Sequence, residues 1–185
     1  MTGNYMIILI VTVLCCSCSG KKSVKQRMAE SRKEIENSPE QLHLNNCKLT
    51  GLDTTHPKTL QEAIGGKPRL MMRFSDQSCD VCVNDLLDKL TAASDKIGNE
   101  NIIILSSFRV YRSFYLFYKK YSNRFTIYNM KDSKMGFKAE YYDAPFLFKV
   151  NSQLIGSDLF VPFKENPLPT VEYLYNAESF FNVPS

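Results

Sequence analysis

The stretch RLMMRFSDQSCDVC, residues 69–82, decides the fold because it joins a strand, the start of a helix and two closely spaced cysteines. Arg69–Phe74 is short and mostly apolar, as expected of a buried strand. From residue 79 to 98 the apolar residues change to a helical spacing. The apolar face of this predicted helix consists of Val83, Leu86, Leu87, Leu90 and Ile97. Cys79 and Cys82 therefore lie where a strand gives way to a helix.

The spacing of these two cysteines suits thiol–disulfide exchange. Two intervening residues on the first turn of a helix bring both sulfurs within bonding range. The unpaired amides of a helix N-terminus favour the thiolate, which is the form that attacks a disulfide. The sequence therefore predicts Cys79 as the exposed nucleophile and Cys82, one turn into the helix, as the thiol that resolves the mixed disulfide.

Strand and helix patterns continue to alternate downstream and predict a single domain over residues 46–185. In chain order we expect a strand at Ile102–Leu105, a helix with Phe114, Phe117, Tyr118 and Tyr121 on one face, a strand at Phe125–Tyr128, a hairpin of Pro145–Val150 and Leu154–Gly156, and a final helix from Pro169 with Val171, Leu174 and Tyr175 turned inward. This order predicts an α/β fold, a sandwich with a central mixed β-sheet flanked by helices.

The arrangement resembles the thioredoxin-like superfamily, in particular the TlpA- and redoxin-type thiol–disulfide oxidoreductases. The resemblance rests on strand 69–74, the Cys79-x-x-Cys82 turn, the helix after it, and Ala144-Pro145 at the head of the hairpin. It implies a thioredoxin-like sandwich in which Pro145 is cis and packs beside the cysteine pair. It also implies that Ala144 and Pro145 bind the substrate peptide.

Several residues depart from that family. Ser78 stands where Trp or Tyr is usual, and Asp80-Val81 replace Gly-Pro or a similar pair. Arg73 stands six residues before Cys79, where thioredoxin itself has a buried Asp that relays protons. Carboxylates at Asp76 and Asp80 oppose a thiolate, whereas an inward-facing Arg73 favours one, so the sequence does not decide the direction of electron flow.

The N-terminus has the features of an export signal. Met6–Leu14 is apolar apart from Thr12 and too short to cross a bilayer, which takes about 20 apolar residues. The Ser17-Cys18-Ser19-Gly20 sequence that follows resembles the lipobox of bacterial lipoproteins, in the form seen in Bacteroidetes. The resemblance implies a signal peptide over residues 1–17 and a diacylglycerol on Cys18, with Cys16 as the second choice of site. An uncleaved hydrophobic segment is the alternative.

Residues 18–45 are predicted to be the lipidated cysteine and a charged tether. Lys21, Lys22, Lys25 and Arg27 follow the anchor, where each contributes about 1 kcal/mol with anionic headgroups. They do not resemble the acidic signal that sends Bacteroidetes lipoproteins to the cell surface. We therefore expect a protein of the cell envelope that is lipid-anchored to a membrane and faces the periplasm. Its partners would be exported thiol or disulfide proteins and an upstream electron donor.

The main alternative for the cysteine pair is a static disulfide, because exported compartments are oxidising. The protein would then be a non-catalytic interaction lipoprotein on a thioredoxin-like scaffold. Peroxidase chemistry fits less well, since Met72 and Asp76 occupy the positions where peroxiredoxins have Pro and Thr. Cys47 has no motif partner, and we expect a buried or partly buried thiol there.

Metal and nucleic-acid binding are not favoured. A zinc site of His43, Cys47, Cys79 and Cys82 lacks a second Cys-x-x-Cys motif. Copper-binding relatives use Cys-x-x-x-Cys and a later His, and no His follows His56. The net charge of +4 is small and scattered, which argues against nucleic acid. We therefore expect neither a metal ion nor another cofactor.

Overall fold

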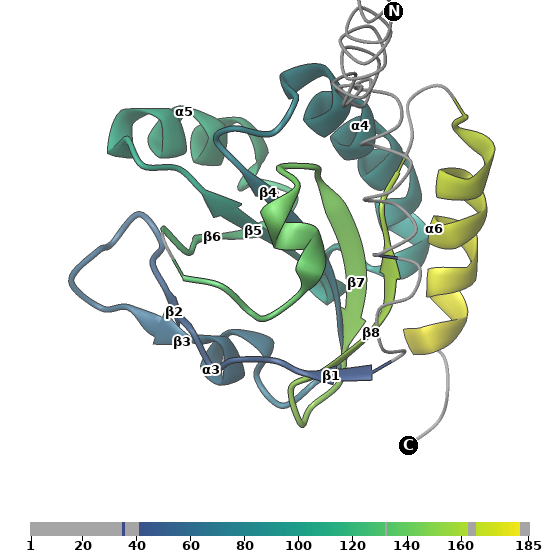
Figure 1. Ribbon diagram of the computed structural model, residues 1–185, viewed down its shortest axis with the longest axis horizontal. Helices are drawn as coiled ribbons and strands as arrows, with labels where there is room; N and C mark the ends of the chain where they lie inside the picture. Colours follow the sequence, from purple (N-terminus) through teal and green to yellow (C-terminus); the bar gives the residue numbers. More distant parts are fainter. Residues whose placement is uncertain (1–34, 36–40, 132, 163–165, 182–185) are drawn as a thin grey trace, which may run out of the picture. The chain divides into compact units, whose positions relative to one another are not determined.

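Six strands form one mixed sheet in the order β1-β8-β7-β4-β5-β6 in this computed structural model (Figure 1). The strands are β1 (Gln41–His43), β4 (Arg69–Ser75), β5 (Ile102–Ser107), β6 (Thr126–Asn129), β7 (Phe146–Val150) and β8 (Ile155–Phe160). The structure describes residues 35, 41–131, 133–162 and 166–181. The expected signal peptide, Cys18 and most of the tether lie outside these residues.

Strand β4 lies in the middle of the sheet. It pairs in parallel with β5, where Leu70 is opposite Ile102, and antiparallel with β7, where Arg73 is opposite Phe146. Every residue of β4 except its two ends is buried. A strand buried on both faces needs a nearly continuous apolar sequence, which explains the run that marks it in the chain.

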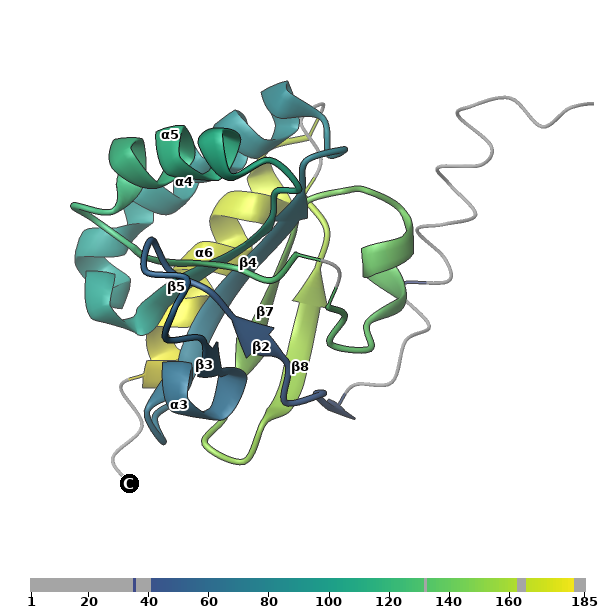
Figure 2. The ribbon, with the colours of Figure 1, turned by 90° about the vertical axis from the view of Figure 1, so that its left-hand side faces the viewer.

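Three helices cover one face of the sheet, as Figure 2 shows. They are α4 (Asp80–Ile97), α5 (Tyr111–Tyr121) and α6 (Leu168–Phe181). The five apolar residues predicted to form the inner face of α4 are all buried. Helix α4 ends at Gly98, whose φ of 90° suits a residue without a Cβ and whose N–H donates to Ser94 O at 2.9 Å. On α5, Phe114 is buried and the other three predicted aromatic residues pack against the same core.

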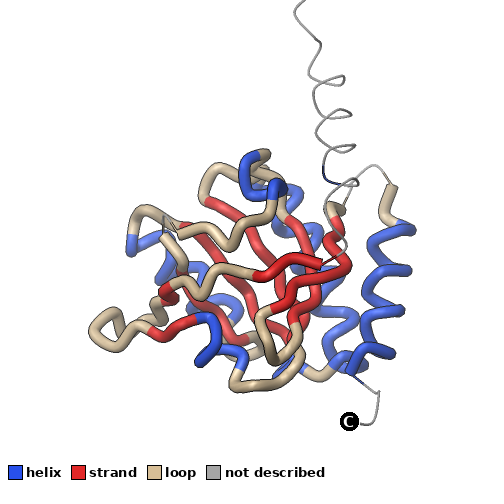
Figure 3. Tube along the Cα trace, turned by 60° about the horizontal axis from the view of Figure 1, so that its bottom comes forward, coloured by secondary structure: helices blue, strands red, loops and turns tan. Residues whose placement is uncertain are grey.

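Shorter elements cover the opposite face. They are α3 (Leu60–Ile64), the 3-10 helix η2 (Lys138–Tyr141), and the small hairpin of β2 (Lys48–Leu49) and β3 (Lys58–Thr59), while the 3-10 helix η1 (Asn99–Asn101) connects α4 to β5. Leu60, Ile64 and Phe137 pack there against Met71 and Phe148 of the sheet. The strands thus form a middle layer with helical segments around it (Figure 3).

The structure confirms the α/β class and the mixed sheet and corrects two details. Strand β1 pairs with β8 upstream of residue 46, so part of the segment expected to be tether belongs to the sheet. In α6 Leu174 faces inward as predicted, but Val171 and Tyr175 are exposed. The buried residues of α6 are Thr170, Leu174 and Ala177. Their helical spacing is offset by one residue from the predicted one, and Leu174 belongs to both patterns. Among the described helices, none combines the length and apolar character needed to cross a membrane.

Candidate functional site

The loop between β4 and α4 is a tight turn that delivers Cys79 to the start of the helix. The N–H of Ser75 donates to Ser78 Oγ at 3.0 Å, and the N–H of Ser78 donates to Ser75 O at 3.1 Å. Ser78 is buried, whereas Cys79 directly after it is exposed. The small Ser78, in place of an aromatic residue, is thus used to close the turn.

Cys79 is the N-cap residue of α4. Its Sγ accepts a hydrogen bond from Cys82 N at 3.4 Å. Cys82 Sγ lies 2.6 Å from Cys79 Sγ, and the Cys82 side chain is half-buried. A backbone amide and the positive end of the helix both favour a negative charge on the Cys79 sulfur. The geometry thus brings the two predicted cysteines together, with the first exposed and the second behind it.

Asp76, whose negative charge disfavours a thiolate on the nearby Cys79, forms an ion pair with Arg109. Arg109 Nε donates to Asp76 Oδ2 at 3.0 Å, and the Arg109 N–H donates to the same oxygen at 3.2 Å. Partial burial raises the pKa of Asp76, but the combined effect of the Arg109 hydrogen bonds and charge brings it below its ordinary value. The carboxylate is therefore charged and paired at neutral pH, which weakens its repulsion of Cys79.

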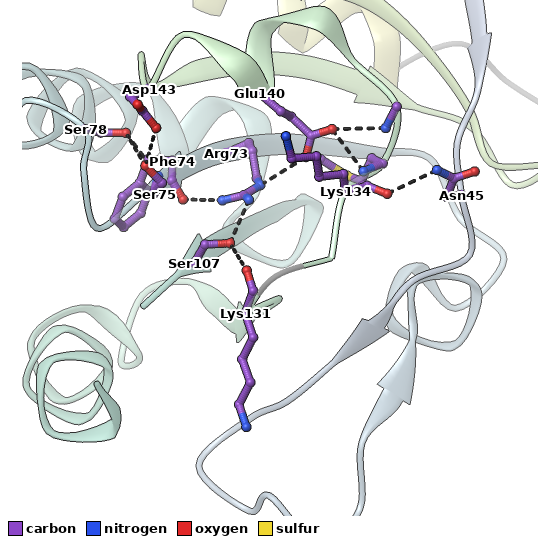
Figure 4. Close-up of polar contacts among 12 residues, drawn as sticks. Asn45, Arg73, Phe74, Ser75, Ser78, Ser107, Lys131, Lys134, Glu140 and Asp143 are labelled. Carbon is purple, nitrogen blue, oxygen red and sulfur yellow. Dashed lines mark hydrogen bonds and ion pairs between the residues drawn. The ribbon is translucent and has the colours of Figure 1, made fainter. Parts of the chain in front are cut away.

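Arg73 is the centre of a buried polar network on the side of the sheet opposite α4 (Figure 4). Its side chain is only 7% exposed, its Nη2 donates to Ser107 Oγ at 2.7 Å, and its Nη1 donates to Phe74 O. Ser107 Oγ in turn donates to Lys131 O at 2.6 Å. Burial lowers the pKa of Arg73, and the charge of Glu140 opposes that change.

Glu140 on η2 is the counter-ion of Arg73. Its side chain is 2% exposed, and its Oε1 lies 3.6 Å from Arg73 Nε. Its other oxygen, Oε2, accepts hydrogen bonds from the N–H groups of Met135 and Gly136, both at 3.0 Å. This one carboxylate therefore ties the segment before η2 to β4. Sequence reasoning did not find Glu140, although a charged residue within an apolar strand indicates that a buried partner exists.

Ala144 and Pro145 lie between η2 and β7, close to the cysteine turn. Ser75 Oγ donates to Asp143 Oδ1 at 3.2 Å, and Ser78, Asp143 and Ala144 line one small cavity. Ala144 is half-buried and Pro145 is buried. The peptide bond before Pro145 is trans, since the described residues contain no cis bond, so the expected cis isomer is not present.

An open groove of about 420 Å³ begins at the cysteine turn. Residues 75–77 of the β4–α4 loop form one side of it. The charged residues of its lining are Arg73, Asp76, Arg109, Lys131, Lys134, Glu140 and Asp143. A substrate segment next to Cys79 would therefore meet a polar surface with several cations.

Cys47 is apart from the cysteine pair. It is half-buried and packs against the core cluster that contains Met71 and Phe148, which agrees with the expected partly buried thiol. Burial raises the pKa of its thiol. Over the described part of the chain, no three His, Cys, Asp or Glu side chains are close enough to share a metal ion.

Comparison with known proteins gives relatives in structure only. No family model and no curated protein matches the sequence. A protein of Aquifex aeolicus VF5 with a proposed role in electron transport superimposes with a TM-score of 0.53 at 13% identity, covering 77% of this chain and 99% of its own. Copper-bound ScoI of Arabidopsis thaliana gives a TM-score of 0.51 at 12% identity, with coverages of 76% and 100%.

A second Aquifex aeolicus VF5 protein, with a proposed role in electron transfer, gives a TM-score of 0.50 at 11% identity, with coverages of 77% and 95%. Sequence identities this low support a shared fold but do not show a shared activity. The copper belongs to ScoI, and this chain has neither the Cys-x-x-x-Cys spacing nor a His after His56. The shared architecture is a central mixed sheet flanked by helices, and the chain has a thioredoxin-like fold.

Proposed function

We propose that this chain is a thiol–disulfide oxidoreductase that exchanges disulfides with exported proteins through Cys79 and Cys82. One observation carries the proposal. The exposed Sγ of Cys79 caps α4, accepts the Cys82 amide at 3.4 Å, and lies 2.6 Å from Cys82 Sγ. An attacking thiol needs exposure and a stabilised thiolate, and a resolving thiol must be within reach of it.

In the reducing direction the Cys79 thiolate attacks one sulfur of a substrate disulfide. The substrate S–S bond breaks, the other substrate sulfur leaves as a thiolate that takes up a proton, and a mixed disulfide with Cys79 forms. Cys82 then loses its proton and attacks Cys79 Sγ, which releases the second substrate thiol. The substrate gains two electrons, the Cys79–Cys82 disulfide forms, and a dithiol electron donor must reduce the pair again.

Ala144 and Pro145 are proposed to shape the surface against which the substrate lies. Asp143, directly before them, accepts a hydrogen bond from Ser75, so this loop is held beside the turn that ends in Cys79. Ala144 lines the same cavity as Ser78. A peptide bound through its backbone at Ala144 would place its cysteine near the Cys79 sulfur.

The location of the protein is also a proposal. Signal cleavage before Cys18, a lipid on that residue and a body that faces the periplasm rest on the sequence pattern alone, and Cys18 lies outside the described residues. Mass spectrometry of the purified chain would test this. We expect a mature N-terminus at Cys18 carrying diacylglycerol, and an intact residue 1 would contradict it.

The activity is tested by the reduction potential and by cysteine variants of the full-length chain in a mild non-ionic detergent. A potential between about −270 and −120 mV supports an exchange catalyst, and one below about −300 mV indicates a structural disulfide and an interaction lipoprotein. Cys79→Ser should abolish exchange, while Cys82→Ser should accumulate the mixed disulfide. Cys47→Ser is the matched control and should exchange at the wild-type rate.

A further inference from the structure

The groove at the cysteine turn continues into a second groove of about 450 Å³ toward the β2–β3 hairpin. Lys131 and Ser133 line both grooves, so the two adjoin, and we refer to them together as the trough. One end of the trough lies at residues 75–77, just before Cys79, and the other lies at Lys48 on β2.

The charges of the described trough residues are unbalanced. Its described lining contains the cations Lys48, Arg73, Arg109, Lys131 and Lys134 and the anions Asp76, Glu140 and Asp143. Two of the anions are already engaged, because Asp76 pairs with Arg109 at 3.0 Å and Glu140 pairs with Arg73 at 3.6 Å. Outside these two pairs, the described lining leaves three lysines, Lys48, Lys131 and Lys134, against one carboxylate, Asp143.

These three lysines are available to a ligand. Each is exposed, and within the described residues none of them forms an ion pair. Lys134 Nζ lies 3.6 Å from the centre of the Tyr141 ring, a contact that does not neutralise its positive charge. Lys131 is fixed through its backbone, where its carbonyl accepts from Ser107 Oγ, while its side chain extends away from Arg73 (Figure 4).

From this surplus we infer that the trough binds an extended acidic segment adjoining the reactive cysteine of the substrate protein. The inference rests on the proposed exchange activity and names its substrate class. Carboxylates of such a segment would meet Lys134, Lys131 and Lys48 in turn while its cysteine lies at Cys79. A positive groove raises the association rate of a negatively charged partner by tenfold or more, and salt screens the effect.

Matched peptides test the inference on the full-length chain in non-ionic detergent. Each peptide has one cysteine held as a mixed disulfide with 2-mercaptoethanol, flanked by four Glu residues in one peptide and four Gln residues in the other. The rate of exchange with the reduced protein is divided by that peptide's rate with dithiothreitol. We expect the acidic peptide to react about tenfold faster at low ionic strength, with little difference at 0.5 M salt.

The variant Lys48→Gln/Lys131→Gln/Lys134→Gln should reduce the ratio of the acidic to the neutral rate to about twofold or less. The control Lys67→Gln/Lys96→Gln/Lys119→Gln removes the same charge at exposed lysines outside the trough and should keep the preference. Equal rates for both peptides with the wild type would overturn the inference, and so would an equal loss of preference in the two variants.

Failure of the proposed function gives a different result, because neither peptide would then exchange. The trough is tested in that case by fluorescence anisotropy with the same peptides carrying Ser in place of Cys. Tighter binding of the acidic peptide, lost in the trough variant and kept in the control, supports the acidic-segment site without the redox step. Absence of binding by both peptides refutes the site.

Discussion

Replacing Arg73 with Met should destabilise the protein strongly, because it leaves the Glu140 carboxylate buried without its counter-ion. The two side chains are 7% and 2% exposed and lie 3.6 Å apart. At an effective dielectric constant of about 20, charges at that separation attract each other by roughly 4–5 kcal/mol. Loss of one member of a buried pair typically costs 3–5 kcal/mol. We therefore expect Arg73→Met to lower the free energy of unfolding by about 3–5 kcal/mol.

A double variant measures how much Arg73 and Glu140 stabilise each other, apart from their contacts with other residues. Glu140→Gln alone leaves Arg73 charged and buried, but the Gln oxygen can still accept from Met135 N and Gly136 N. In Arg73→Met/Glu140→Gln neither charge remains, so much of the loss should be recovered. We expect the double variant to be about 2–3 kcal/mol more stable than the sum of the two single changes predicts, a coupling within the range for contacting residues.

The wild type, the two single variants and the double variant are unfolded with urea in non-ionic detergent and followed by far-UV circular dichroism. The four free energies of unfolding complete the double-mutant cycle. Equal slopes against urea concentration would show that the variants unfold from comparable native states. Strictly additive losses would refute the reasoning, because they would mean that Arg73 and Glu140 do not stabilise each other. A loss below about 1 kcal/mol for Arg73→Met would do the same, since it would show that the pair is hydrated in solution.

Two further predictions concern packing and pH. Gly156→Ala places a Cβ 2.7 Å from Phe137 Cζ and 2.9 Å from Leu44 Cδ2, so we expect a loss of about 1–3 kcal/mol in urea unfolding, whereas Gly51→Ala, with no atom within 4 Å, is the control. Arg109→Gln removes the cation that helps to hold the pKa of Asp76 below its ordinary value. A lowered folded-state pKa gives stability that is present above the unfolded value of about 3.9 and lost as the pH falls through the folded value. Wild type should therefore exceed Arg109→Gln in stability at pH 6, and the two should converge near pH 2; a constant difference would exclude this linkage.

The long elements of the fold could be predicted from sequence, because each has several repeats of its own period. The apolar face of α4 and the aromatic face of α5 cover more than two helical turns, and β4 is a continuous apolar run. The two-residue strands β2 and β3 have no period to detect. Helix α3 did carry a signal, since Thr59 and Glu62 form a capping box whose spacing is visible in the sequence.

The cysteine pair could be placed from sequence for a related reason. Cys79 and Cys82 are local to one helix start, so their mutual geometry follows from the helix alone. The trough is different, because it combines residues from β2, the β4–α4 loop and the segment after β6. Lysines at such separations have no shared pattern in the sequence. Lys48 is brought near the end of β6 by the bridge between Thr50 and Asn129, a contact that the sequence does not reveal.

Arg73 shows why the electrostatics of the cysteine pair could not be worked out from the sequence. Alternation along β4 places Arg73 on the face of Met71, opposite Met72 and Phe74, which pack with α4. Its guanidinium therefore bonds to Ser107 and Glu140 and does not lie beneath the helix that carries Cys79. The alternation is visible in the sequence, but the partner on η2 is not. Arg73 thus lines the groove. The charges nearest the Cys79 sulfur are the positive end of α4 and the carboxylate of Asp76, which is paired with Arg109.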